Sequence, residues 1–248
     1  MAFIVNIDGK PLIYVHNTNL GTNGRAYNAG VEYDSIDVTA FSDAAHRNIL
    51  GQHTVTFRYD GLFDDAAVAS HAALNDMLTN KRTVSVWPAG DGTGTEGIGI
   101  GTAFAQNYRP GGNVGEFLSL GMDISADAQW DRLVSLGSRV VLTTGTSGTL
   151  AGPDVNGGST ATAGGGFFIH VFAQQGTVNW LVAVQDSTGG GATGYANVAT
   201  ATFNAATGGT IITFTGSLRQ FRRYHVSQVA AATTGSGTIT IAASVSTR

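Results

Sequence analysis

Residues 92–97 read Gly-Thr-Gly-Thr-Glu-Gly and fit the Gly-x-Gly-x-x-Gly pattern of dinucleotide-binding loops. Such a loop holds a pyrophosphate where it joins a strand to the first turn of a helix, because the helix amides bind the phosphates. Here Pro88 precedes the motif, and the following residues, Ile-Gly-Ile-Gly, favour a strand or a loop. The sequence therefore predicts a hairpin at this point and no nucleotide site.

The six histidines could in principle bind a metal, and they are scattered through the chain. No two of them have the four-residue helical spacing by which a helix offers two ligands to one zinc ion. The sequence also contains no cysteine, which excludes disulfides, thiolate catalysis and cysteine-ligated metals. We expect structural histidines and no cofactor.

Nucleophilic and paired-carboxylate catalysis have little support. No Gly-x-Ser-x-Gly elbow precedes a helical segment. Asp64 and Asp65 are adjacent, but they precede a helical pattern and are explained by capping. Asp34 and Asp37 flank a strand. The sequence neither excludes nor supports their action as the paired catalytic carboxylates of a glycosidase. The chain is predicted not to be an enzyme.

The one basic cluster consists of Arg219, Arg222 and Arg223, with Phe221 and Tyr224 interleaved. Such a mixture could bind an anionic polymer or a sugar. Alternatively, these arginines lie on the outward face of a strand, since alternate residues of a strand point away from the core. We favour the second interpretation.

The elements that must position these residues are mostly strands. Hydrophobic residues make up 42 % of the chain, and 35 glycines against 4 prolines are typical of an all-β protein with many turns. Residues 53–61 alternate, with Val55, Phe57 and Tyr59 on one face and polar residues on the other. We predict a single helix over residues 66–79. Lys81 and Arg82 follow it, where positive charges interact favourably with the C-terminal end of the helix dipole.

A second composition begins near Thr143. Residues 143–166 are almost wholly Gly, Thr, Ser and Ala, which predicts a linker and the first turns of another domain. Short strands separated by Gly-rich turns follow, as in a β-sandwich. The predicted fold is therefore mainly β, with a first domain over residues 1–142, a linker over 143–166 and a C-terminal β-sandwich over 167–248.

Charge and hydropathy limit the classes of partner. The net charge is −4, and the first 144 residues carry the acidic excess, which argues against tight binding to a phosphate backbone. No apolar run approaches the ~20 residues that cross a bilayer. The N-terminus lacks the basic and apolar regions of a signal peptide, so we expect synthesis in a cytoplasm.

Residues 1–140 contain several short motifs in a characteristic order. They are Asp-Val-Thr at 37–39, Thr-Val-Thr-Phe at 54–57 and Asp-Gly-Leu-Phe-Asp at 60–64, followed directly by the helical segment. With these motifs, the region resembles the tail tube (major tail) proteins of long-tailed, non-contractile bacteriophages. An apolar N-terminal arm with Asp8-Gly9 precedes them. A turn with the sequence Tyr-Arg-Pro-Gly-Gly-Asn-Val-Gly-Glu, at 108–116, joins the closing strand pair.

The resemblance implies a β-sandwich or barrel with one flanking α-helix, of which six copies form a ring. Inner strands of the ring close into one large barrel, and rings stack into the tail tube of a virion assembled in the host cytoplasm. DNA passes through the lumen without specific binding. The implied partners are further copies of the chain and the tape measure, tail tip and terminator proteins. A contractile-tail or type VI secretion tube is a near neighbour of this interpretation.

The C-terminal region contains three further motifs, Val-Gln-Asp-Ser at 184–187, Arg-Arg-Tyr at 222–224 and Gly-Ser-Gly-Thr-Ile-Thr-Ile at 235–241. With these motifs, it resembles the Ig-like or jelly-roll-like domains that decorate some phage tail tubes. Their folds are similar to carbohydrate-binding sandwiches, so a carbohydrate-binding adhesion protein is the alternative function. The candidate exterior ligand surface comprises Trp180, Tyr195, Arg222 and Arg223, although Trp180 lies in a strand with a core pattern.

The loop over residues 40–52 is long for a hairpin and carries apolar residues, which indicates a partner. In the family the matching loop packs against the neighbouring ring. The candidate ring–ring and subunit contacts are Phe41, Asp43, His46, Arg47, Ile49 and Leu50 of the loop, with Phe3, Ile4 and Ile7 of the N-terminal arm. The alternative is that both segments pack onto their own domain.

Acidic residues in a lumen would keep passing DNA from adhering, because like charges repel. The candidates are Asp34, Asp37, Glu116 and Asp123, and alternation alone does not say which of them face inward.

Overall fold

The computed structural model describes residues 11–40, 45–65, 70–113, 117–127, 130–144, 149–157, 164–175, 179–191, 193–204, 208–228 and 237–246. The fold is mainly β, as predicted. In chain order the elements are β1 (Leu12–Val15), β2 (Thr18–Asn19), a 3-10 turn η1 (Leu20–Thr22), β3 (Gly24–Asp37), β4 (Asn48–Leu62), α1 (Ser70–Asp76), β5 (Arg82–Trp87), β6 (Glu96–Gly111), β7 (Ser119–Ala126), β8 (Trp130–Thr144), β9 (Thr149–Ala151), β10 (Val155–Asn156), β11 (Gly165–Gln175), β12 (Asn179–Ser187), β13 (Ala196–Asn204), β14 (Gly208–Phe214), β15 (Phe221–Gln228) and β16 (Gly237–Ser246).

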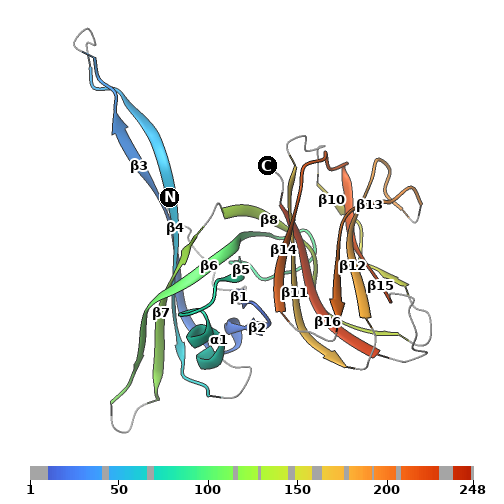
Figure 1. Ribbon diagram of the computed structural model, residues 1–248, viewed down its shortest axis with the longest axis horizontal. Helices are drawn as coiled ribbons and strands as arrows, with labels where there is room; N and C mark the ends of the chain where they lie inside the picture. Colours follow the sequence, from blue (N-terminus) through green and yellow to red (C-terminus); the bar gives the residue numbers. More distant parts are fainter. Residues whose placement is uncertain are drawn as a thin grey trace.

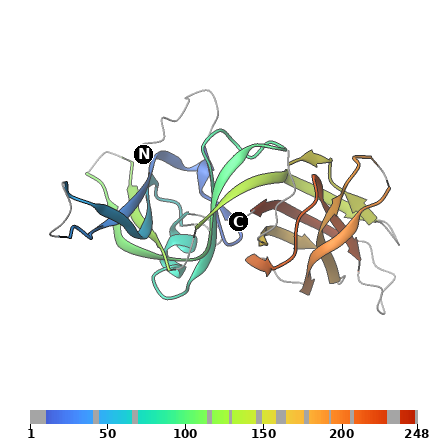
Figure 2. The same cartoon turned by 90° about the horizontal axis from the view of Figure 1, so that it is seen from above.

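Two sheets organise these strands. The larger runs β14-β11-β16-β8-β6-β5-β1-β2, and a branch from β6 continues through β7 and β4 to β3. The smaller runs β10-β15-β12-β13, with β9 also paired to β15. Figure 1 shows the branch as a tall sheet at the left and the two layers of a β-sandwich at the right. Figure 2 views the same arrangement from above, with the sandwich and the branch at opposite ends of the molecule.

The first core lies between the branch and α1. Val55, Phe57 and Tyr59 of β4 are buried, as their alternation predicts, and the side chains between them face away from this core. Leu74 of α1 and Met77, just beyond it, are buried in the same core. The alternation of residues 53–61 is thus confirmed, because one face of this strand packs against a helix and the other does not.

The helix is shorter than predicted. It covers Ser70–Asp76, residues 66–69 lie outside the described part of the chain, and residues 77–79 form turns. At its last residue, the Asp76 carboxylate accepts hydrogen bonds from the Arg82 guanidinium and, at 2.8 Å, from Asn80 Nδ2. Thr79 and Asn80 then both donate their backbone N–H groups to the Asp76 carbonyl.

The second half of the chain is joined to the first through β8. Residues 130–134 of β8 pair with β6, and residues 133–144 pair with β16 of the sandwich. The predicted boundary near residue 142 therefore falls inside one strand. Within the predicted linker, β9 and β10 both pair with β15, and β11 begins at Gly165. The division into domains 1–142 and 167–248 stays a prediction.

An apolar cluster and a chain of buried hydrogen bonds hold the two halves together. The cluster consists of Tyr14, Trp87, Leu133, Phe168, Phe172 and Ala242. Next to it, the His170 imidazole is buried, with Nδ1 donating to the His16 carbonyl at 2.8 Å and Nε2 lying 2.8 Å from Ser85 Oγ. Since His170 Nδ1 carries the proton, Nε2 accepts from the Ser85 hydroxyl. Burial lowers the pKa of His170 to about 4, so the ring is neutral at pH 7.

Candidate assembly and ligand surfaces

The hairpin of β3 and β4 projects beyond the rest of the protein (Figure 1). The two strands pair from Gly24 and Gly61 to Asp37 and Asn48. The neighbouring strand β7 covers β4 only over Thr56–Leu62, so the outer half of the hairpin is a two-stranded ribbon among the described residues. An isolated ribbon is marginally stable in water, which makes this one a surface that gains from a partner.

The end of this ribbon is apolar on one face. Ile36 and Ile49 lie opposite each other in the ladder and are 50 % and 52 % exposed, and Val38 follows two residues later, also exposed. Beyond them, Asp37 accepts a hydrogen bond from the Thr39 backbone at 2.9 Å and lies 3.5 Å from His46 Nδ1. Hydrogen bonds from Thr39 lower the pKa of the Asp37 carboxyl. We call Ile36, Val38 and Ile49 the apolar tip.

The predicted contact residues divide into two groups. His46, Arg47 and Ile49 are exposed near the apolar tip. The remaining residues lie outside the described part of the chain: Phe3, Ile4, Ile7, Phe41 and Asp43. For Leu50, the backbone is described and the side chain is not. Ile36 and Val38 are not among the predicted contact residues, although their alternation at the end of a strand, opposite an apolar residue, is a pattern that predicts them.

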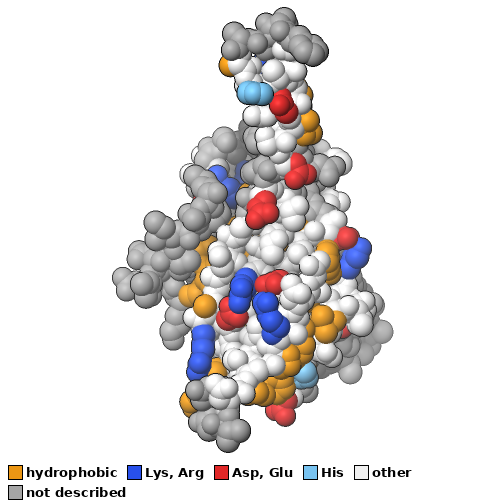
Figure 3. All heavy atoms as spheres, turned by 90° about the vertical axis from the view of Figure 1, so that its left-hand side faces the viewer, with side chains coloured by type: hydrophobic (Ala, Val, Ile, Leu, Met, Phe, Trp, Pro, Cys, Tyr) orange, Lys and Arg blue, Asp and Glu red, His pale blue; other side chains and the backbone are white. Residues whose placement is uncertain are grey.

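Strands β3, β4, β7 and β6 form a four-stranded unit whose second face is polar. Arg58 of β4 lies beside Asp123 of β7 in the ladder. Arg58 Nε is 3.2 Å from Asp60, and Arg109 Nη2 is 3.4 Å from Asp123, which also accepts from Asn107 at 2.9 Å. Figure 3 shows this face, with acidic and basic side chains adjacent in its lower part and acidic ones nearer the projecting hairpin.

The lumen candidates are placed as follows. Asp123 lies on the polar face and is engaged by Arg109 and Asn107, while Asp34 and Asp37 are exposed on the projecting hairpin. Glu116 lies outside the described residues. The polar face is therefore charge-compensated in its lower part.

The four-stranded unit has two open edges among the described residues. Strand β3 pairs with β4 alone. Beyond Ala105, strand β6 pairs with β7 on one side and with no described strand on the other. Open edges present unpaired N–H and C=O groups, which proteins cover by pairing with another chain or by shielding.

Two residues of the predicted exterior ligand surface are internal, which corrects that prediction. Trp180 is 0 % exposed in the sandwich core, because its position on β12 faces the opposite sheet. Arg222 is 3 % exposed, and its Nε donates to the Arg219 carbonyl at 3.1 Å. Its neighbour Asp186 is also buried and accepts from the Arg219 backbone at 2.8 Å. Neither Trp180 nor Arg222 can contact an external ligand.

The other two residues of that surface, Tyr195 and Arg223, lie together. The guanidinium carbon of Arg223 is 3.8 Å from the centre of the Tyr195 ring. Arg223 Nε donates to Gln185 at 3.0 Å, and Gln185 donates to Asn197 at 2.8 Å. Burial, aided by the Asp154 carboxylate, raises the pKa of Tyr195 to about 12. Because Arg223 covers a face of the tyrosine ring, that face is not free to stack on a sugar.

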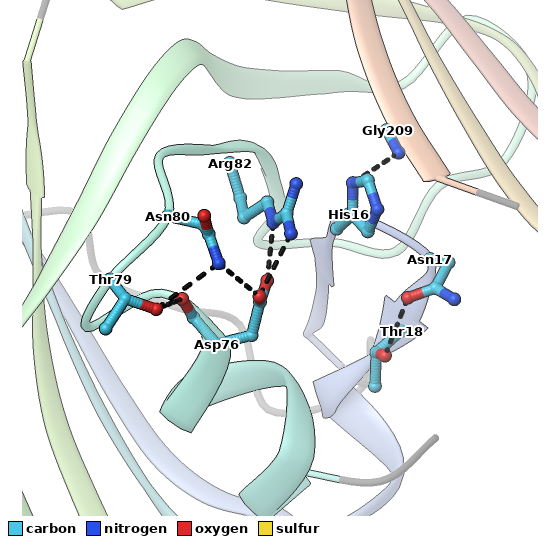
Figure 4. Close-up of polar contacts among 8 residues, drawn as sticks. All are labelled: His16, Asn17, Thr18, Asp76, Thr79, Asn80, Arg82 and Gly209. Atoms are coloured by element: carbon cyan, nitrogen blue, oxygen red, sulfur yellow. Dashed lines mark hydrogen bonds and ion pairs between the residues drawn. The ribbon is translucent and has the colours of Figure 1, made fainter. Parts of the chain in front are cut away.

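A polar cavity of about 210 Å³ lies where α1 faces the turn between β1 and β2 (Figure 4). Its lining residues are His16, Asn17, Thr18, Ala72, Ala73, Asp76 and Arg82. Asp76 and Arg82 form an ion pair on one wall, and His16 Nδ1 accepts from the Gly209 backbone at 2.9 Å. Burial, then the nearby Arg82, lowers the pKa of His16. The charges of this wall are compensated, and none of the predicted site residues lines the cavity.

The glycine motif at 92–97 lies in the connection between β5 and β6, as predicted. Strand β6 begins at Glu96, inside the motif, so no helix N-terminus faces the loop.

Among the described residues, no group of three His, Asp or Glu is arranged to hold a metal. Within the same residues, no helix has the length and hydropathy needed to cross a membrane.

Comparisons with known proteins give partial structural similarity. Neither a protein-family model nor a curated protein matches the sequence. A protein of the native gene transfer agent virion is 14 % identical with a TM-score of 0.43, covering 51 % of this chain and 97 % of its own. The Dit hub protein of phage SPP1 is 11 % identical with a TM-score of 0.32, covering 94 % and 98 %. A structure of infectious bursal disease virus, Gx strain, is 8 % identical with a TM-score of 0.29, covering 96 % and 55 %. Because every TM-score is below 0.5, these similarities carry no argument about function.

Proposed function

We propose that this protein is a structural virion protein that assembles into the tail tube of a long-tailed phage. One observation carries the proposal: a four-stranded unit has one face in the core, one polar face, two edges without a partner among the described strands and a projecting hairpin with an apolar tip. In a tube, the edges would close a ring, the polar face would line the lumen and the hairpin would contact the next ring. A monomer would leave the edges and the apolar tip exposed to water.

The open edges serve ring closure in this proposal. The outer edge of β3 on one copy pairs with the free part of β6 on the next, so that several copies close a barrel without remaining edges. We propose six copies, as in the family that the sequence resembles. The core face with α1 then lies outside the barrel, and the polar face lines the lumen.

The polar face suits a conduit for DNA. Arg58 and Arg109 are basic, but Asp60 and Asp123 lie within ion-pair distance of them. A phosphate backbone is held by clustered, available Lys and Arg, and here the positive charges are compensated. DNA would therefore slide past the face, and the acidic Asp37 of the hairpin would add repulsion.

The sandwich lies outside the tube in this proposal, because it sits away from the polar face, beyond the core and the junction (Figure 2). The buried contacts of His170 with Ser85 and with the His16 carbonyl fix it to the first half. The proposed partners are copies of this chain within the tube and, at its ends, tape measure, tail tip and terminator proteins. No chemical step is part of the function.

Negative-stain electron microscopy of the concentrated protein tests the proposal. Hollow tubes or rings with outer knobs are the expected result. A compact, closed dimer or trimer without rings would contradict it. The rival function, a carbohydrate-binding adhesion protein, has less support from these residues, since Trp180 is buried and Arg223 covers one face of the Tyr195 ring.

A further inference from the structure

Exposed apolar side chains gather at the two ends of the four-stranded unit. Six large hydrophobic residues are strongly exposed in the described part of the chain. Three of them form the apolar tip, and two, Phe117 and Leu118, lie in the turn between β6 and β7. The sixth, Leu78, follows α1. Clusters of exposed apolar residues mark interaction sites in soluble proteins. We therefore expect both ends of the unit to contact another molecule.

Phe117 and Leu118 directly precede β7, whose first residue pairs with Leu62 at the end of β4 opposite the apolar tip. Phe117 is 78 % exposed, and the Arg25 guanidinium, at the start of β3, lies 6.0 Å from its ring centre. The Leu118 carbonyl accepts from the Phe63 backbone at 2.9 Å, just after the end of β4. We call Phe117 and Leu118 the apolar base. It is held at the foot of β3 and β4, while the apolar tip lies at their other end.

The two apolar surfaces cannot meet within one copy. Strand β4 runs from Asn48 to Leu62, and at ~3.3 Å per residue it separates them by about 46 Å. A second copy translated along the strands, in contrast, brings the tip of one molecule to the base of the next. The ends also carry opposite exposed charges, since Asp34 is two residues before Ile36 in β3 and Arg25 lies beside Phe117.

We propose that the apolar base is the docking site for the apolar tip of another copy of this chain. The contact is heterologous, so it generates an open stack of copies and not a closed dimer. It buries Ile36, Val38 and Ile49 against Phe117 and Leu118 and brings Asp34 toward Arg25. This inference rests on the proposed tube function and identifies which surface of the neighbour receives the hairpin.

Cysteine cross-linking tests the contact cleanly, because the chain has no cysteine of its own. Ile49→Cys and Phe117→Cys are made singly and together, concentrated to assembly, and treated with a mild oxidant or a short bismaleimide. The double variant should give a ladder of covalent oligomers on a denaturing gel. An equal mixture of the single variants should give dimers, and each single variant alone should stay monomeric. The matched control combines Ile49→Cys with Thr200→Cys, an exposed position on the sandwich, and should give no ladder.

The outcomes separate this inference from the proposed function. Tubes or rings seen by microscopy without a ladder would overturn the docking site and leave the tube function in place. Dimers from Ile49→Cys alone would show a tip-to-tip contact and would also overturn it. A closed dimer without rings would remove the tube function, and the docking site with it.

Discussion

The imidazole of His170 and the hydroxyl of Ser85, 85 positions apart in the sequence, are joined by a 2.8 Å hydrogen bond in the interior of the protein. Ser85 belongs to β5 of the first half and His170 to β11 of the sandwich. The other ring nitrogen donates to the His16 carbonyl, so that one side chain satisfies two groups of the first half. The sandwich is thus fixed through a buried polar contact as well as through the shared strand β8.

Replacing His170 with Ala should destabilise the protein by roughly 2–4 kcal/mol. The change leaves the Ser85 hydroxyl and the His16 carbonyl without their buried partner, and each such loss costs about 1–3 kcal/mol. Urea unfolding monitored by tryptophan fluorescence measures the effect. His46→Ala, at an exposed histidine, is the control and should change stability by less than about 0.5 kcal/mol. Equal stability of the two variants would contradict this role of His170.

Stability should fall as the pH drops from 7.5 to 5. The pKa of His170 is lowered from 6.5 to about 4 by burial, so between these values the unfolded chain binds a proton that the folded protein excludes. The contribution is therefore full above pH 6.5 and is lost as the pH falls toward 4, about 2 kcal/mol by pH 5. The pKa of His16 is lowered as well and acts in the same direction. The difference in the free energy of unfolding between the native protein and His170→Asn, measured at each pH, isolates the contribution of His170. If this difference did not change with pH, the assigned role of His170 would be wrong.

The fold was predictable where a local pattern decides it. The alternation around Phe57 identified a strand with one buried face, and Pro88 with the residues after Gly97 identified a hairpin at the glycine motif. The helix was overestimated because the apolar positions continue past Asp76, whereas residues 77–79 form turns and Asp76 is engaged by an ion pair with Arg82. That pair depends on where β5 begins, which the helical pattern does not contain.

The candidate surfaces were less predictable, because they depend on how distant strands pair. The Gly- and Thr-rich composition of residues 143–166 predicts a linker, yet β9 and β10 pair with β15, about 70 residues later. Arg222 and Arg223 are adjacent in the sequence, and only the register of β15 decides that Arg222 faces inward. The contact between Ser85 and His170 has no local signature at all.

Trp180→Ala should destabilise the protein by about 3–5 kcal/mol, as expected for the truncation of a fully buried aromatic residue. Arg223→Ala removes a partly exposed cation–π contact and a hydrogen bond, and should cost about 1 kcal/mol or less. Thermal unfolding of both variants measures the contrast. If Trp180→Ala unfolded like the native protein, the assignment of Trp180 to the core would be wrong. If Trp180→Ala lost glycan binding, its folding would have to be measured first, because unfolding alone would remove binding.

The double change Ile36→Ser and Ile49→Ser should prevent copies from stacking into tubes without unfolding the protein. Both side chains are about half exposed at the end of a ribbon, so the folded monomer loses little, within about 0.5 kcal/mol. The proposed contact with the next copy loses its apolar centre. Electron microscopy and sedimentation of the concentrated protein measure assembly, and circular dichroism measures folding. Leu78→Ser is the matched control, since Leu78 is exposed to a similar extent away from the tip, and it should still assemble.

The axial repeat of the tube should not exceed about 46 Å. If the apolar tip of one copy rests on the apolar base of the next, the length of β4 limits the separation of successive rings, and any tilt of the strands shortens it. The repeat is read from the layer lines of averaged tube images. It should be the same in Leu78→Ser tubes, because that substitution lies outside the proposed contact. A clearly longer repeat would mean that the hairpin does not reach the base of its neighbour, and another segment of the chain would then have to join the rings.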